Sequence, residues 1–99
     1  MSFESKIKSG DLDAFFRAVL ALESEEECYR FFEDIATVAE IKSLAQRFQV
    51  AEMLTEDETY IKIALATGAS TATISRVKRA LNYGADGYKL VLNRLREEK

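Results

Sequence analysis

Apolar residues recur along this chain at the spacing of an α-helix, and no segment shows the alternation of a half-buried strand. The pattern is clearest from Leu12 to Leu22 and from Ile41 to Leu54, where side chains three or four residues apart share one apolar face. The chain also contains no proline, which would remove a backbone hydrogen bond from a helix interior. Together these features predict an all-α fold.

Residues that cap helices divide the chain into six predicted helices. Asp11 can accept hydrogen bonds from the free backbone amides at the start of the first helix. Ser24 with Glu27, and Thr37 with Glu40, match the capping box that opens the second and third helices. In such a box each of the two side chains accepts a hydrogen bond from the other residue's backbone amide.

Glycine and serine mark the remaining helices. The fourth follows residues 55–58 and ends at Gly68, which can adopt the left-handed conformation that closes a helix. Ser70 caps the fifth helix, which ends by Gly84, and the sixth runs from about Asp86 to Glu97.

A chain of 99 residues is close to the size of one domain, so we expect a single domain over residues 1–99 with a thin core. The pairs Phe15–Phe16 and Phe31–Phe32 point to two sides of their helices at once. One side can face the core of the same chain, and the other side needs a second surface. A homodimer meets this need, with a thicker monomer core as the alternative.

Several absences narrow the function. No apolar run approaches the roughly 20 residues that cross a bilayer, and Met1–Lys6 lacks the features of a secretory signal. We therefore expect no membrane partner and a cytoplasmic location, which suits a chain with a single cysteine, Cys28. This cysteine is expected to be a small buried apolar residue. Without histidine the commonest general base and metal ligand are missing, so we expect neither an enzyme nor a metal site.

The formal net charge of −3 hides an uneven distribution. Residues 1–58 contain 6 Lys and Arg against 14 Asp and Glu, whereas residues 59–99 contain 8 against 3. Binding to DNA depends on a local basic face rather than on total charge, so an acidic protein can still bind DNA. A solvated surface without a partner is the alternative interpretation of this asymmetry.

Residues 58–83 have the pattern of a helix-turn-helix, centred on Gly68–Leu81. The second helix begins with small, mostly hydroxyl-bearing residues, which let a helix end enter the major groove of DNA and contact phosphates or base edges. The candidate DNA contacts are Thr71, Ala72 and Ser75 to base edges, Lys62, Ser70, Thr73, Lys78 and Arg79 to the phosphate backbone, and Arg76 to either. A helical hairpin with a solvated basic face is the alternative.

The stretch Gly68–Arg76 resembles the recognition motif of the Trp repressor family. The similarity extends back through Leu44–Leu54 and forward into the last helix, and Ser70–Tyr88 resembles more specifically the largely uncharacterised Trp-repressor-like proteins of Firmicutes. This resemblance implies a six-helix subunit that intertwines with a second copy into an obligate homodimer. The two helix-turn-helix units would then enter successive major grooves of double-stranded DNA, about 34 Å apart, on a palindromic operator.

The resemblance also implies a ligand pocket, which in the family holds the corepressor L-tryptophan. Thr37, Arg47 and Arg76 match positions that contact this ligand. Val77 stands where the family has a glycine, and Ala80 stands where it has a serine. The valine would occupy space needed by the indole ring, and the alanine lacks a hydroxyl for the amino group of the ligand. We therefore expect no cofactor and no use of L-tryptophan, and leave open an unknown small-molecule effector.

The sequence thus predicts a sequence-specific DNA-binding transcriptional regulator, a repressor, that acts as a dimer without tryptophan. Two alternatives share this fold. The first is a protein–protein adaptor whose acidic half binds a basic partner, and the second is a non-specific DNA-binding protein. The modest basic charge argues against the second alternative, because sequence-blind binding depends mainly on electrostatics.

Overall fold

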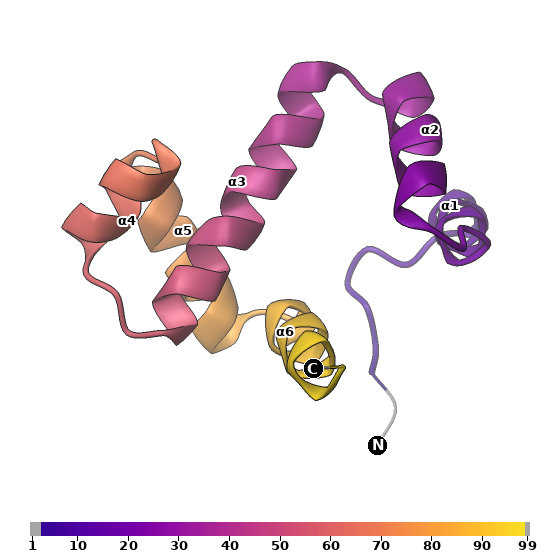
Figure 1. Cartoon of the computed structure of the whole chain (residues 1–99). Helices are drawn as coiled ribbons and strands as arrows, with labels where there is room; N and C mark the ends of the chain where they lie inside the picture. The colour runs from indigo at the N-terminus through magenta and orange to yellow at the C-terminus, as the bar shows by residue number, and fades with distance from the viewer. Residues whose placement is uncertain (1–2, 99) are drawn as a thin grey trace. The chain divides into compact units, whose positions relative to one another are not determined.

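The computed structural model describes residues 3–98 and contains six α-helices joined by short connections (Figure 1). In chain order the helices are α1 (Gly10–Leu20), α2 (Glu25–Ile35), α3 (Val38–Thr55), α4 (Tyr60–Thr67), α5 (Thr71–Tyr83) and α6 (Gly87–Glu97). Strands are absent from residues 3–98, so the predicted all-α fold is confirmed. Within the same residues, no helix combines the length and the hydropathy needed to span a membrane.

The predicted capping residues open α2 and α3. The Glu27 amide donates to Ser24 Oγ at 3.1 Å, and the Glu40 amide donates to Thr37 Oγ1 at 3.1 Å. The Glu40 carboxylate in turn accepts from the Thr37 amide at 2.8 Å, whereas the Glu27 carboxylate accepts from the amide of Glu23 at 2.8 Å. Hydrogen bonds from Thr37, first from its backbone and then from its side chain, lower the pKa of Glu40 because they favour the charged form.

The first helix begins earlier than predicted. Ser9, not Asp11, caps α1, and its Oγ accepts from the Leu12 amide at 3.3 Å. Asp11 lies in the first turn, where its carboxylate accepts from the Ser9 hydroxyl at 2.5 Å and faces the positive end of the helix dipole. The bond from Ser9 is the main cause of the lowered pKa of Asp11. The assignment of Asp11 as the cap was therefore wrong, because a serine two residues earlier offers the same kind of acceptor.

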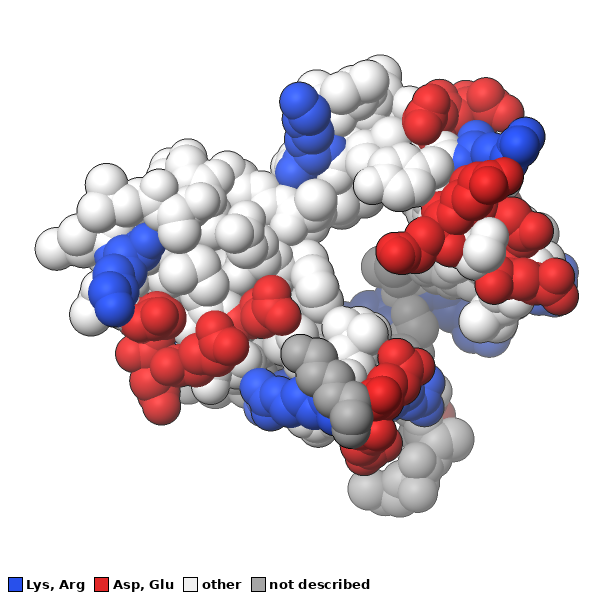
Figure 2. Space-filling view, in the orientation of Figure 1, with Lys and Arg blue, Asp and Glu red and all other residues white. Residues whose placement is uncertain are grey.

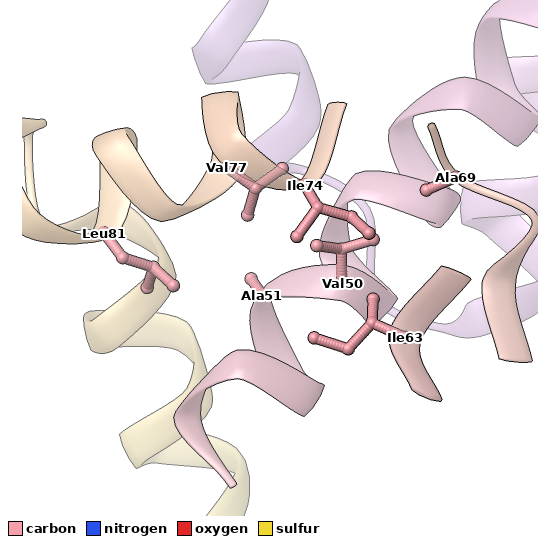
Figure 3. Close-up of a cluster of buried hydrophobic side chains, with 7 residues drawn as sticks. All are labelled: Val50, Ala51, Ile63, Ala69, Ile74, Val77 and Leu81. Atoms are coloured by element: carbon pink, nitrogen blue, oxygen red, sulfur yellow. The ribbon is translucent and has the colours of Figure 1, made fainter. Parts of the chain in front are cut away.

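Contacts within the chain form two compact units, one ending at Ile41 and one beginning at Lys42, here called the N-terminal and C-terminal units. In the C-terminal unit, buried side chains from α3, α4, α5 and the turn before α5 converge (Figure 3). They are Val50, Ala51, Ile63, Ala69, Ile74, Val77 and Leu81. This core determines which face of α5 is exposed. The single domain expected over residues 1–99 stays a prediction.

The N-terminal unit has no fully buried residue in α1 or α2. The phenylalanines of these helices contact one another, with ring centroids 5.6 Å apart for Phe15–Phe16, 6.0 Å for Phe15–Phe31 and 5.5 Å for Phe31–Phe32. Cys28 is exposed, so its expected burial is wrong within the single chain, because nothing in this unit covers its side of α2. Acidic side chains gather over α2 on the face seen in Figure 2.

Candidate nucleic-acid interface

Two helices and the turn between them form the candidate interface. α4 begins after Thr59, whose Oγ1 accepts from the Lys62 amide at 3.2 Å, and it ends at Gly68. Gly68 has a φ of +74°, the left-handed conformation expected of this glycine. Ser70 then caps α5 by accepting from the Thr73 amide at 3.1 Å. The short helix, the glycine turn and the capped helix predicted from the sequence are all present.

A set of side-chain hydrogen bonds attaches the turn to α3 and α4. Gln46 Nε2 donates to the Thr67 carbonyl at 3.1 Å. The Thr67 hydroxyl donates to the Ile63 carbonyl at 2.8 Å and accepts from the Ala69 amide at 3.1 Å. The bond from Gln46 was not predicted, because Gln46 and Thr67 lie 21 residues apart and leave no local pattern. Together these bonds hold the start of α5 in one position relative to α3.

The two sides of α5 differ in chemistry. Ile74, Val77 and Leu81 lie at helical spacing on one side and are buried in the core. The exposed residues of the helix include six of the predicted DNA contacts, namely Thr71, Ala72, Ser75, Arg76, Lys78 and Arg79. α5 contains three basic residues and no acidic one. Because the buried side of α5 packs against the core, the orientation of its basic side is fixed relative to that core.

Two further predicted contacts, Ser70 and Thr73, bond to each other. The Ser70 hydroxyl donates to Thr73 Oγ1 at 3.1 Å while accepting from the Thr73 amide. Ser70 is exposed and Thr73 is half-buried. A hydroxyl group has one proton to donate, so in this arrangement Thr73 keeps its proton for an outside acceptor and Ser70 does not.

A shallow groove lies along the exposed face of α5. Its lining residues are Tyr60, Ala72, Ser75, Arg76, Lys78, Arg79 and Asn82. The structure thus brings five predicted DNA contacts together and adds Tyr60 and Asn82, which were not predicted from the sequence. Asn82 lies four residues after Lys78, so helical spacing could have indicated it. Tyr60 comes from α4, and only the packing of the two helices places it in the groove.

Lys62, on α4, lies outside this groove, as do Ser70, Thr71 and Thr73. The Lys62 Nζ is 3.6 Å from Glu58 Oε1, four residues earlier, in a pair whose lysine is exposed and whose glutamate is half-buried. A solvent-accessible ion pair of this kind contributes about 1 kcal/mol or less. Glu58 therefore does not prevent Lys62 from binding a phosphate.

The positions predicted as a ligand pocket have different surroundings. Thr37 belongs to the N-terminal unit, where it caps α3. Arg47 lies in α3 and donates to Ser43 Oγ at 3.1 Å, and Arg76 lies in the exposed groove of α5. The ligand pocket itself stays a prediction.

The two positions that differ from the family pattern face apolar surroundings. Val77 is 1% exposed and belongs to the core cluster, so its methyl groups contact the protein itself. Ala80 is half-buried and lines an apolar hollow of about 500 Å³. The other residues of that hollow are Phe48, Ala85, Gly87, Tyr88 and Val91. Hydrogen-bonding side chains are scarce there, in keeping with the alanine at this position.

A short helix, a glycine turn and a capped helix with a fixed basic face define a helix-turn-helix protein. The chain belongs to the Trp repressor family, since the sequence model of that family, described as Trp repressor protein, matches residues 10–96. The resemblance inferred from Gly68–Arg76 is therefore confirmed.

Known relatives extend this similarity over most of the chain. The uncharacterized protein YerC of Bacillus subtilis (strain 168) is 58% identical over 92 residues, which cover 93% of this chain and 88% of YerC. The crystal structure of a proposed Trp repressor from Staphylococcus aureus has a TM-score of 0.88 and 53% identity, covering 92% of this chain and 91% of the other. A TrpR-like protein from Eubacterium eligens ATCC 27750 has a TM-score of 0.88 and 57% identity, covering 91% and 93%. The fold is that of a Trp repressor.

Proposed function

We propose that this protein is a transcriptional regulator that binds double-stranded DNA at a specific sequence. The observation that carries this proposal is the exposed face of α5. The face begins with small and hydroxyl-bearing residues, which suit base edges, and continues one turn later with basic residues, which suit phosphates. The Trp repressor family, a family of DNA-binding regulators rather than of enzymes, supports the same function.

The regulator acts as a homodimer on a palindromic operator. Support comes from the N-terminal unit, whose exposed large apolar side chains include Phe16, Leu20, Tyr29, Ile35 and Val38. Full burial of such a side chain stabilises a fold by about 1.5–3 kcal/mol, so a second copy of the same surface is favourable. Two identical helix-turn-helix units then bind two half-sites of inverted sequence.

DNA binding by this dimer does not require L-tryptophan. Val77 joins α5 to α3 and α4 through the buried cluster, so the protein supplies its own apolar contact where the family has a glycine. Because the core holds α5 without a ligand, the DNA-binding face is formed in the free protein. Titration calorimetry with L-tryptophan is expected to give no binding heat, and a micromolar dissociation constant would contradict this part of the proposal.

Selection of bound fragments from sheared host DNA, near physiological salt and with or without L-tryptophan, tests the function. We expect enrichment of one palindromic sequence under both conditions. Thr71→Asp should abolish the enrichment, because it places a carboxylate at the exposed start of α5 where phosphates approach. Sedimentation and circular dichroism establish that both proteins are folded dimers.

The outcome also separates the alternatives. Retention of fragments without a preferred sequence would replace the proposal with a non-specific DNA-binding protein. No retention of DNA by the folded dimer would favour the adaptor, whose acidic N-terminal unit would bind a basic protein. Repression, supported by the name of the family, is tested by transcript levels of the genes beside the selected site, which should rise when this protein is deleted.

A further inference from the structure

Lys78 in the groove of α5 lies over an aromatic ring from the neighbouring helix. Its Nζ is 5.7 Å from the centroid of the Tyr60 ring, within the range of a cation–π interaction. Tyr60 is the first residue of α4 and packs half-buried against the core cluster. The ring is therefore held in place by packing, whereas the lysine has a flexible four-carbon stem.

This pair lies at the boundary between two hollows of the C-terminal unit. Tyr60, Lys78 and Asn82 line both of them. The first hollow is the candidate DNA groove, where the other charged side chains are Arg76 and Arg79. A phosphate bound in that groove would contact the Lys78 ammonium group from the side on which the guanidinium groups of Arg76 and Arg79 lie.

The second hollow offers Lys78 a competing partner. It contains the carboxylates of Asp57 and Glu58 as well as Lys89. Among the ion pairs formed within residues 3–98, Glu58 pairs with Lys62, and none joins Lys78 to a carboxylate. The lysine thus lies next to the Tyr60 ring although two carboxylates line the same hollow.

We infer that Tyr60 is a positioning residue for DNA binding: its ring holds the Lys78 ammonium group for a backbone phosphate and away from Asp57 and Glu58. The inference rests on the proposed DNA-binding function. A lysine that is already restrained loses less conformational freedom on binding, and it has no ion pair to break. The Tyr60 hydroxyl is dispensable in this role, because the ring makes the contact.

Salt-dependent DNA binding distinguishes this role from a purely structural one. The probe is a random-sequence duplex of about 30 base pairs, long enough for two half-sites one helical turn apart. Fluorescence anisotropy gives the affinity at several salt concentrations for the wild type, Tyr60→Phe, Tyr60→Leu, Lys78→Met and the double variant Tyr60→Leu/Lys78→Met. Tyr83→Leu is the matched control, because Tyr83 is 83% exposed on the same helix as Lys78 and does not line the groove.

Each variant has a distinct expected result. The slope of log affinity against log salt is negative, and Lys78→Met should reduce its magnitude by about 0.9 for each phosphate that the ammonium group neutralises in the wild type. Tyr60→Leu should weaken binding about two- to fivefold and also reduce the magnitude of this slope. Tyr60→Phe and Tyr83→Leu should match the wild type. The double variant should bind as Lys78→Met does, because Tyr60 acts through the lysine.

Three results would overturn the inference. They are wild-type affinity and slope in Tyr60→Leu, equal weakening of binding in Tyr60→Phe and Tyr60→Leu, and additive effects in the double variant. No binding of this duplex by the folded wild type would also overturn the inference, because Lys78 then holds no backbone phosphate, whereas the proposed function is judged separately by the fragment selection described above. Thermal unfolding is measured for every variant, and Tyr60→Met replaces Tyr60→Leu if the leucine variant is not folded at the assay temperature.

Discussion

In the C-terminal unit α3, α4 and α5 cover one another, and Ile63 and Ile74 are completely buried. In the N-terminal unit α1 and α2 bury no residue completely, and Leu20 is 82% exposed. Both units are rich in apolar side chains, but three crossing elements can enclose a cluster, whereas two short helices leave one side of each uncovered. Apolar side chains on that side remain in water unless another surface covers them.

This difference fits the proposed function. A core complete within one chain gives the exposed face of α5 a fixed direction, which recognition of DNA requires. The uncovered faces of the N-terminal unit are suited to a second copy of the chain. The charges differ between the units as well, since residues 1–41 contain 4 Lys and Arg against 10 Asp and Glu, whereas residues 42–99 contain 10 against 7.

The largest expected effect tests the core of the C-terminal unit. Ile74→Ala should lower the free energy of unfolding by about 2–5 kcal/mol, because it opens a cavity at a side chain that is 0% exposed. Ile61→Ala is the matched control, since Ile61 is 76% exposed on α4 and its truncation should change this free energy by about 0.5 kcal/mol or less. Chemical denaturation at one protein concentration measures both. Similar destabilisation of the two variants would contradict the assigned core.

A second pair of variants compares two leucines that are both 82% exposed, one in each unit. Leu20→Glu should weaken the dimer by about 2 kcal/mol, or about thirtyfold in dissociation constant, because in the proposed homodimer the second copy covers this residue. Leu65→Glu should leave the dimer unchanged, since α4 belongs to the proposed DNA-binding helix-turn-helix and not to the proposed dimer surface. Sedimentation equilibrium gives both constants. If both substitutions weaken the dimer equally, the proposed division of roles between the two units is wrong.

The turn of the helix-turn-helix is tested by two glycines. Gly68→Ala should destabilise the protein by about 1–2 kcal/mol, because an alanine is strained at a φ of +74° even though the nearest atom, Gln46 Nε2, is 4.0 Å from the added methyl group and does not clash with it. Gly87→Ala should instead be neutral or stabilising by about 0.5–1 kcal/mol, since nothing lies within 4 Å of the added methyl group. Thermal denaturation compares them. Equal stability of the two variants would argue against the left-handed turn.

The smallest effect concerns pH and the helix caps of the N-terminal unit. Hydrogen bonds in the folded state lower the pKa values of Asp11 and Glu40. Each carboxyl therefore contributes stability above its unfolded pKa, and this contribution is lost as the pH falls through the folded pKa. Helix content should decline below the ordinary glutamate pKa of 4.5, and Glu40→Gln should make this decline shallower. A pH titration by circular dichroism measures this decline for the wild type and for Glu40→Gln. Coincident profiles of the two proteins would contradict the stabilising role of the Glu40 carboxylate in the cap.

The exposed face of α5 could be predicted because it depends on spacing within one helix. Ile74, Val77 and Leu81 mark the buried side, so the residues between them face outward. Tyr60 could not be found in this way. It joins the groove through the packing of α4 on α5, and in the sequence this tyrosine looks like an ordinary apolar residue of α4.

The amino-acid sequence was sufficient to establish the number and order of the helices, most of their caps and the basic side of α5. These features arise from hydrogen bonds and side-chain spacing within a few residues, and so they leave a local pattern. The packed structure was needed to establish that Gln46 binds the turn at Thr67, that Lys78 lies over Tyr60, and that Cys28 is left exposed. Whether a given apolar face is covered depends on residues far away in the chain, because burial is a property of packed elements and not of any one of them.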